Sequence, residues 1–277
     1  MDETAIRAAF LAACELDVAA LKPGNVHRDA DGHGMTVADF IASAEAAAPA
    51  LCRAGSPLGR RLFDAVTATR QAVGCNTNLG ILLLCAPLAV AAESGSTVAA
   101  VLRALRMDDA ELAYRAIALA EPGGLGDGGD DDVRQPPRLG LVAAMALAAP
   151  RDRIAQLYAD DFADLRVFTL PLLYSRLAGG EGIAAATTAL YLTVLARWPD
   201  SHLVRKFGDN AAHSVTREAA EILGRWSAEN SAPVRRTLLL DWDKSLKARG
   251  FNPGTSADLT VATLFAHGLT RGAARLA

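Results

Sequence analysis

The sequence has no excess of either charge, since 28 Lys and Arg residues stand against 31 Asp and Glu residues, for a net charge of −3. Proteins that bind nucleic acid mainly through its phosphates need a basic excess to displace counterions, so we expect no nucleic-acid partner. Aromatic residues make up only 5% of the chain, whereas hydrophobic residues make up 51%. A core that is rich in Ala and Leu and poor in aromatics favours packed helices over sheets.

Long hydrophobic runs and metal-binding histidine patterns are also missing. The longest apolar run, residues 81–92, is too short to cross a bilayer, and the acidic start at Asp2 and Glu3 is unlike a secretory signal. The four cysteines form no CxxC pair, and the five histidines form no HxxxH or HExxH pattern, which disfavours a disulfide scaffold and a zinc enzyme. We therefore expect a cytoplasmic protein with no membrane partner.

Apolar residues recur at helical spacing along the whole chain, without a convincing alternating strand pattern. We expect about a dozen helices in a single all-α domain over residues 1–277, because no long polar linker divides the chain. The expected helices cover residues 4–21, 36–53, 57–73, 77–93, 97–105, 109–120, 139–149, 152–177, 182–197, 201–226, 234–249 and 256–270.

The apolar helix faces predict a homodimer, because they exceed what one domain is expected to bury. The face used for this prediction consists of Leu82, Leu83, Ala86, Val90 and Ala91.

Four breaks between the expected helices concentrate glycines and polar side chains, at residues 22–28, 74–80, 123–137 and 251–259. Loops of this kind on a helical scaffold are where chemistry is commonly placed. The candidate side chains of the first two breaks are Lys22, Asn25, His27, Asn76, Thr77 and Asn78. Three consecutive hydrogen-bonding residues at 76–78 exceed what one helix cap needs, so that capping alone and ligand binding both remain open.

The helix before the first break carries Glu15 in the row Leu11, Glu15, Val18, Lys22. A carboxylate in a partly apolar row is either paired with a nearby cation, here Lys22, or functional.

The third break is the most acidic and includes Asp127, Asp131 and Asp132. Clustered carboxylates suit Mg²⁺, which takes oxygen ligands and often shares them with phosphates. Taken alone, the break favours a solvated loop slightly over a metal site, because acidic Gly-rich loops are common. Asp132 is the strongest candidate because Val133 and Arg134 resume an ordered-looking segment.

The fourth break is typical of a tight turn that leads into a helix, with Asp258 in the first turn. Asp258 can serve the helix dipole, and the same turn offers free N–H groups to a phosphate. Asn252 and Thr255 can supply further hydrogen bonds.

Two further patterns bear on anionic ligands. Arg205 and Lys206 stand one turn into a helix, where cations oppose the dipole, so an anionic partner or a surface ion pair would explain them.

Residues 160–164 match the short DDxxD pattern of all-α prenyl-diphosphate enzymes, but without a second acidic motif we interpret them mainly as a solvated helix face.

Taken together, the breaks resemble the triphosphoribosyl-dephospho-CoA synthase family of CitG and MdcB type. The resemblance extends over almost the whole chain. The matching stretches are residues 22–26, 35–43, Asn76-Thr77, 124–126 leading to Asp132-Val133, 198–206, and 252–255 leading to Asp258-Leu259.

The resemblance implies an all-α fold and transfer of a triphosphoribosyl group from ATP to a hydroxyl of dephospho-CoA, with Mg²⁺ and with release of adenine. Family members commonly carry His-x-Asp-Met where this chain has His33-Gly34-Met35, and Asn-Thr-His-Lys-Gly where it has residues 76–80 as Asn-Thr-Asn-Leu-Gly. In both places a charged residue is replaced, and the chain is more similar to the CitG-like branch of methanogens and methylotrophs. The donor, the acceptor or both are therefore open. The alternative is an enzyme of one-carbon cofactor biosynthesis, of methanopterin or methanofuran type, that acts on a different phosphorylated substrate.

The resemblance and the chemistry of ribosyl transfer together assign roles to the candidates. Carboxylates stabilise an oxocarbenium-like state, and proton transfers serve the leaving base and the acceptor hydroxyl. The catalytic candidates are Glu15, Asp132 and Asp258, and the metal candidates are Asp127, Asp131, Asp132 and Asp258. The substrate-binding candidates are Lys22, Asn25, His27, Asn76, Thr77, Asn78, Arg134, Arg205, Lys206, Asn252 and Thr255. The rivals are an Mg²⁺-dependent all-α enzyme for another phosphorylated substrate, such as a prenyl diphosphate, and a non-catalytic nucleotide-binding protein.

Overall fold

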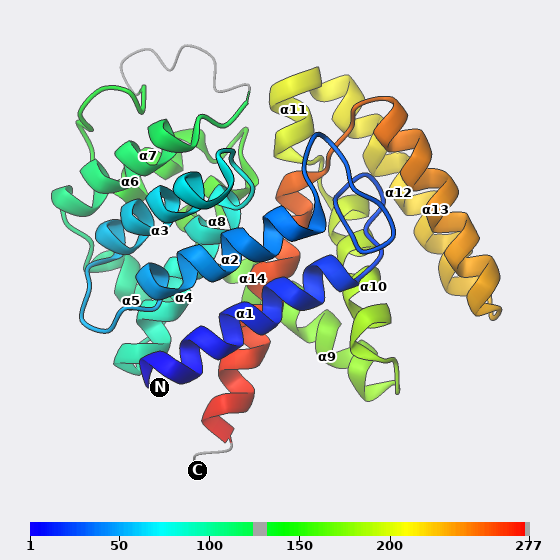
Figure 1. Ribbon diagram of the computed structural model, residues 1–277, viewed down its shortest axis with the longest axis horizontal. Helices are drawn as coiled ribbons and strands as arrows, with labels where there is room; N and C mark the ends of the chain where they lie inside the picture. The colour runs from blue at the N-terminus through cyan, green and yellow to red at the C-terminus, as the bar shows by residue number, and fades with distance from the viewer. Residues whose placement is uncertain (124–131, 275–277) are drawn as a thin grey trace.

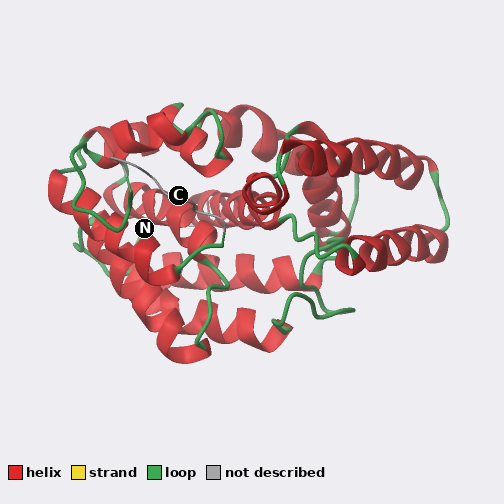
Figure 2. Ribbon diagram, turned by 90° about the horizontal axis from the view of Figure 1, so that it is seen from above, coloured by secondary structure: helices red, strands yellow, loops and turns green. Residues whose placement is uncertain are grey.

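The computed structural model describes residues 1–123 and 132–274, and the side chains up to residue 270. All regular secondary structure in this part of the chain is helical, which confirms the predicted all-α class (Figure 2). The helices are α1 (Glu3–Ala19), α2 (Val37–Leu51), α3 (Leu58–Val73), α4 (Leu79–Ser94), α5 (Val98–Arg103), α6 (Met107–Ala120), α7 (Leu141–Ala148), α8 (Arg153–Ala159), a π-helical turn (Leu165–Thr169), α9 (Leu170–Ala178), α10 (Ile183–Arg197), α11 (Ser201–Phe207), α12 (Asp209–Ala228), α13 (Ala232–Ala248) and α14 (Gly254–Ala274).

Side-chain caps fix several helix starts close to where the sequence predicts them. Asp2 accepts a hydrogen bond from the backbone N–H of Ala5 at the start of α1, and Thr36 and Asp39 form a reciprocal capping box at the start of α2. The Thr97 hydroxyl accepts a hydrogen bond from the backbone N–H of Ala100 at the start of α5. Each of these side chains satisfies backbone N–H groups that have no partner within the helix.

The single helix predicted over residues 152–177 is wrong, because the chain breaks after α8. Asp161 and Phe162 adopt left-handed backbone conformations, with φ of 55° and 59°. The break lets the Phe162 ring turn inward, where it is 1% exposed and packs against Tyr158. Burial of this aromatic ring thus outweighs the local helical periodicity.

The helix predicted over residues 201–226 is also two helices, because the chain turns at Gly208. This glycine has φ of 80° and separates α11 from α12. α11 is consequently a separate short helix that does not continue into the long α12.

Helix α14 passes through the middle of the molecule, with α2 to α8 on one side and α10 to α13 on the other (Figure 1). It contributes Leu259, Phe265 and their neighbours to the larger apolar core, and Ala257 to a second core with α10, α11, α12 and α13. The first turn of α14 therefore lies where the two cores meet. No helix of the described chain combines the length and the apolar character needed to cross a bilayer.

Helix α4 is apolar and buried along most of its length. Pro87 lies inside it and leaves the carbonyl of Leu83 without a helical donor, and the hydroxyl of Tyr158 donates to that carbonyl at 2.7 Å. Leu82, Leu83, Ala86 and Ala91 are buried within the chain itself. Val90, the fifth residue of this face, is only half-buried. The four buried residues give no support to the homodimer, which stays a prediction.

Candidate functional site

Polar residues from four segments meet at the start of α14, in what we call the polar junction. The segments are the end of α1 with the loop after it, the start of α4, the start of α11 and the start of α14. The residues of the polar junction are Asp17, Lys22, Asn25, Asn78, Asp200, His202, Asn252 and Asp258.

A buried chain of hydrogen bonds links the loop after α1 to the residues before α14. The Lys22 ammonium group donates to Asp17 at 2.5 Å and to Asn25 at 2.9 Å, and Asn25 in turn donates to Asn252 at 2.8 Å. Lys22 has no exposed surface, and Asp17 is 2% exposed. In this arrangement Lys22, expected to bind phosphate, holds the loop in place through Asp17, which the sequence analysis did not select.

The same loop is fixed from its other side by Asp243 of α13. This carboxylate accepts from the backbone N–H of Gly24 at 2.8 Å, and it lies 3.4 Å from Nε2 of His27 and 3.1 Å from the Lys247 ammonium group. Burial would raise the pKa of Asp243, but the nearby His27 ring, the hydrogen bond from Gly24 and the Lys247 ammonium group outweigh it and hold that pKa below its usual value. His27 is itself fully buried, so its position supports a role in shaping the loop.

Asp200 caps two helices with one carboxylate. Its Oδ1 accepts from the backbone N–H groups of His202 and Leu203 at the start of α11, and its Oδ2 accepts from the backbone N–H and the hydroxyl of Ser256 in α14, both at 2.8 Å. Burial raises the pKa of Asp200, and the bonds from Ser256 and Leu203 oppose that shift. One N–H group of the first turn of α14, which the sequence analysis offered to a phosphate, is thus already bound to Asp200.

Asp258 lies directly against the first turn of α4. A Cβ atom added to Gly80 would lie 2.0 Å from Oδ2 of Asp258, so only glycine leaves room for the carboxylate at this position. Burial raises the pKa of Asp258 well above its usual value, the negative charges of Asp200 and Asp17 raise it further, and Arg205 and Lys22 oppose them. The negative charge of Asp258 is therefore poorly compensated in the free protein. Carboxylates with such shifted pKa values are common at functional sites.

The three polar residues before α4 have different partners. Asn76 accepts from the backbone N–H of Leu79 at 3.1 Å, and the Thr77 hydroxyl lies 2.5 Å from that of Ser43 in α2. Asn78 occupies the cap position without capping, is 5% exposed, and has a buried amide nitrogen with no hydrogen-bond partner in the described chain. A buried, unpartnered amide costs free energy, which supports ligand binding by Asn78 over capping.

Leu79, where the family resemblance leads one to expect lysine, is 7% exposed and belongs to the larger apolar core. Leu79→Lys is therefore expected to lower the free energy of unfolding by about 1–3 kcal/mol, because it places an amine in apolar surroundings. Urea unfolding monitored by circular dichroism measures this loss. A variant as stable as the wild type that binds ATP more tightly would contradict the position assigned to Leu79.

Glu15 is not brought to the polar junction. Its side chain is exposed, and it leaves α1 about 200° around the helix from Asp17. Lys22 pairs with Asp17 because α1 ends at Ala19, so the expected row from Leu11 to Lys22 does not continue along the helix. The expected neighbourhood of Glu15 and Lys22 is thus wrong.

The acidic third break contributes little to the described part of the site. Asp127 and Asp131 lie outside the described residues. Asp132 forms an ion pair with Arg134, whose Nε donates to its two carboxylate oxygens at 2.8 and 3.0 Å. Within residues 1–123 and 132–274, no three His, Cys, Asp or Glu side chains are grouped closely enough to hold a metal ion.

The basic residues Arg205 and Lys206 belong to α11, the helix that begins at the polar junction. Arg205 forms an ion pair with Asp152, which caps α8, and the Lys206 side chain lies along Gly123. His202, between Asp200 and these cations, was missed by the sequence analysis. Thr255 is 3% exposed in the first turn of α14.

The DDxxD segment is not the solvated helix face that the sequence predicts. It contains the break after α8, where Asp160 accepts from the backbone N–H of Ala163 and Asp164 forms an ion pair with Arg153. Burial raises the pKa of Asp160. These carboxylates stabilise a turn, and they do not share one helix face.

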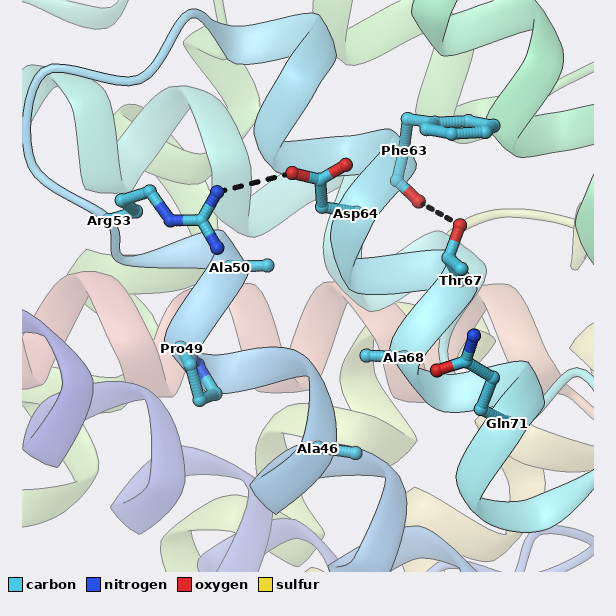
Figure 3. A pocket seen from close by; sticks show the side chains of 9 residues that line it. All are labelled: Ala46, Pro49, Ala50, Arg53, Phe63, Asp64, Thr67, Ala68 and Gln71. Carbon is cyan, nitrogen blue, oxygen red and sulfur yellow. Dashed lines mark hydrogen bonds and ion pairs between the residues drawn. The ribbon is translucent and has the colours of Figure 1, made fainter.

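Two surface pockets lie away from the polar junction. One of about 290 Å³ lies between α2 and α3, where Arg53 and Asp64 form an ion pair at 3.2 Å (Figure 3). The other, of about 750 Å³, is lined by residues from the start of α3, the end of α4, α5 and α6. Neither is lined by any residue of the polar junction.

Comparisons with known proteins agree on one family. The family model described as CitG, ATP:dephospho-CoA triphosphoribosyl transferase, matches residues 3–275. A protein of Pseudomonas savastanoi pv. phaseolicola named "Probable 2-(5''-triphosphoribosyl)-3'-dephosphocoenzyme-A synthase" is 28% identical over 217 residues, which cover 76% of this chain and 67% of that protein.

The fold also matches a solved structure. A crystal structure of a candidate triphosphoribosyl-dephospho-CoA synthase from Archaeoglobus fulgidus superposes with a TM-score of 0.64 at 24% identity, over 82% of this chain and 97% of that one. Because the family match covers nearly all of its residues, this chain belongs to the CitG family of ATP:dephospho-CoA triphosphoribosyl transferases.

Proposed function

We propose that this protein transfers the triphosphoribosyl group of ATP to a hydroxyl of dephospho-CoA, or of a related cofactor precursor, and releases adenine. The observation that carries the proposal is the family match over residues 3–275. The polar junction supports it, because Asp258 lies against Gly80 at the start of α4 and His202 lies against Gly254 at the start of α14. Asn78, two residues before Gly80, has a buried amide nitrogen without a hydrogen-bond partner in the described chain.

The reaction breaks the bond between C1′ of the ribose and the adenine nitrogen, and forms a bond from C1′ to the acceptor oxygen. The adenine leaves with a proton, and the acceptor hydroxyl loses one, so that protons balance. Positive charge develops at C1′ in the transition state. The negative charge of Asp258 is poorly compensated in the free protein, and the positive charge at C1′ would stabilise it. Asp258 would therefore favour the transition state over the bound substrate.

Mg²⁺ fits this site only if the triphosphate of the substrate supplies part of its ligands. The described residues offer no group of three metal-binding side chains, and Mg²⁺ in nucleotide enzymes commonly uses one or two carboxylates together with substrate phosphates. Asp258 can supply one such carboxylate. The bound ion would neutralise phosphate charge, while Asn78 orients the substrate beside Gly80.

The proposal is tested by incubating the protein with ATP, dephospho-CoA and Mg²⁺ and separating the products by chromatography with mass detection. We expect adenine and an adduct of dephospho-CoA with triphosphoribose in equal amounts, and neither product when EDTA replaces Mg²⁺. Adenine without the adduct would indicate another acceptor. Absence of adenine with every acceptor hydroxyl offered would refute the transfer.

A further inference from the structure

We propose that His202 contacts the polyphosphate chain of the substrate, as part of a binding face that it forms on α11 with Arg205 and Lys206. The inference rests on the proposed function for the identity of the ligand. The residues follow one another at positions i, i+3 and i+4, so their side chains leave the same face of the helix. The face uses side chains and no backbone groups.

The His202 ring lies against α14. A Cβ atom added to Gly254 would lie 2.7 Å from Nδ1 of His202, so the ring edge packs against the first turn of α14. Its other nitrogen, Nε2, is buried and has no hydrogen-bond partner among the described residues. Buried polar atoms are normally hydrogen-bonded, and an exception in a native fold calls for an explanation such as a ligand.

Arg205 provides a second, independent observation on the same face. Its Nη1 is paired with Asp152, but its Nε is also buried without a hydrogen-bond partner in the described chain. Two unused nitrogen atoms three residues apart, with the Lys206 ammonium one residue further, form an arrangement of donors that suits the closely spaced oxygens of a polyphosphate.

His202 is expected to contribute a hydrogen bond and no charge. Burial lowers the pKa of His202 to about 3, and the charges of Lys206, Arg205 and His33 act in the same direction. The imidazole is therefore neutral at physiological pH, and it adds a donor to the face without a third positive charge that would repel Arg205 and Lys206 in the free protein.

The test measures binding of inorganic tripolyphosphate and of adenosine to the full-length protein by calorimetry. His202→Phe keeps the ring that packs on Gly254 and removes Nε2, and we expect it to weaken tripolyphosphate binding about tenfold or more while adenosine binding stays unchanged. His202→Gln, which can place a donor near the position of Nε2, is expected to restore most of the affinity. His213→Phe on the exposed face of α12 is the matched control and should bind both probes as the wild type does.

Equal tripolyphosphate binding by wild type and His202→Phe would overturn the inference, and so would absence of tripolyphosphate binding by the wild type. Loss of adenosine binding in His202→Phe as well would also overturn it, since it would indicate a purely structural role. The proposed transfer fails separately: if no adenine is released but His202-dependent tripolyphosphate binding persists, only the reaction is refuted.

Discussion

Replacing Asp258 by asparagine is expected to slow adenine release at least about 100-fold, since it removes the negative charge that would stabilise the transition state. The same replacement is expected to stabilise the fold. Burial raises the pKa of Asp258, so the folded protein resists its ionisation, and asparagine has the shape of the neutral acid. Loss of activity with a gain in stability separates a functional carboxylate from a structural one.

The pH dependence of this effect has a definite sign. Because the folded pKa of Asp258 is raised, its contribution to stability is fully present below its unfolded value near 3.8 and is lost as pH rises through the folded value. The difference in unfolding free energy between Asp258→Asn and wild type should therefore grow in favour of the variant from pH 4 towards pH 8, as measured by urea unfolding.

Asp160→Asn provides the control, because Asp160 is also a partly buried carboxylate with a raised pKa but lies outside the polar junction. It should leave adenine release unchanged. An Asp258→Asn variant that keeps wild-type activity, or an Asp160→Asn variant that loses it, would contradict the assignment.

Replacing Asp200 by alanine is expected to lower the free energy of unfolding by about 3 kcal/mol or more. Three backbone N–H groups and the Ser256 hydroxyl lose their acceptor at once, and each buried group left unsatisfied costs about 1–3 kcal/mol. Urea unfolding of Asp200→Ala measures the loss. Asp209→Ala is the matched control, because Asp209 is exposed in the first turn of α12 and should cost less than about 1 kcal/mol.

If Asp200→Ala proved as stable as Asp209→Ala, the double cap would not hold α11 and α14 together. The starts of these helices position His202 and Asp258, so activity should fall along with stability. A stable but inactive Asp200→Ala variant would instead indicate that Asp200 acts in the chemistry.

The helices could be predicted because their apolar stripes and caps are local properties of the sequence. The two wrong helices show where local information fails. The inward turn of Phe162 depends on a core formed by distant residues. A single glycine such as Gly208 can also occur inside a continuous helix, and only the packing of α11 on α14 shows that the chain turns there. Both breaks are decided by tertiary packing.

The site was only partly visible in the sequence for a similar reason. Lys22, Asn25, Asn252 and Asp258 stand out because they are polar residues in breaks between apolar helices. Asp17 has a signal that was overlooked: it falls on the buried stripe of α1, where a carboxylate needs a partner or a function.

Asp200 was recognisable only as a helix cap. Its second partner, Ser256, lies 56 residues further along the chain, and no pattern in the sequence connects the two.

The central claim is that the transfer takes place where Asp258 meets the start of α4, and Gly80→Ala tests it most directly. The new Cβ would lie 2.0 Å from Oδ2 of Asp258 and must displace it, whereas Gly224→Ala adds the same methyl group to α12, where no atom lies within 4 Å. Adenine release from ATP in the presence of dephospho-CoA and Mg²⁺ is the measurement for both variants. We predict that Gly80→Ala loses at least about 100-fold in rate while Gly224→Ala keeps the wild-type rate; wild-type adenine release by a folded Gly80→Ala variant would contradict the account.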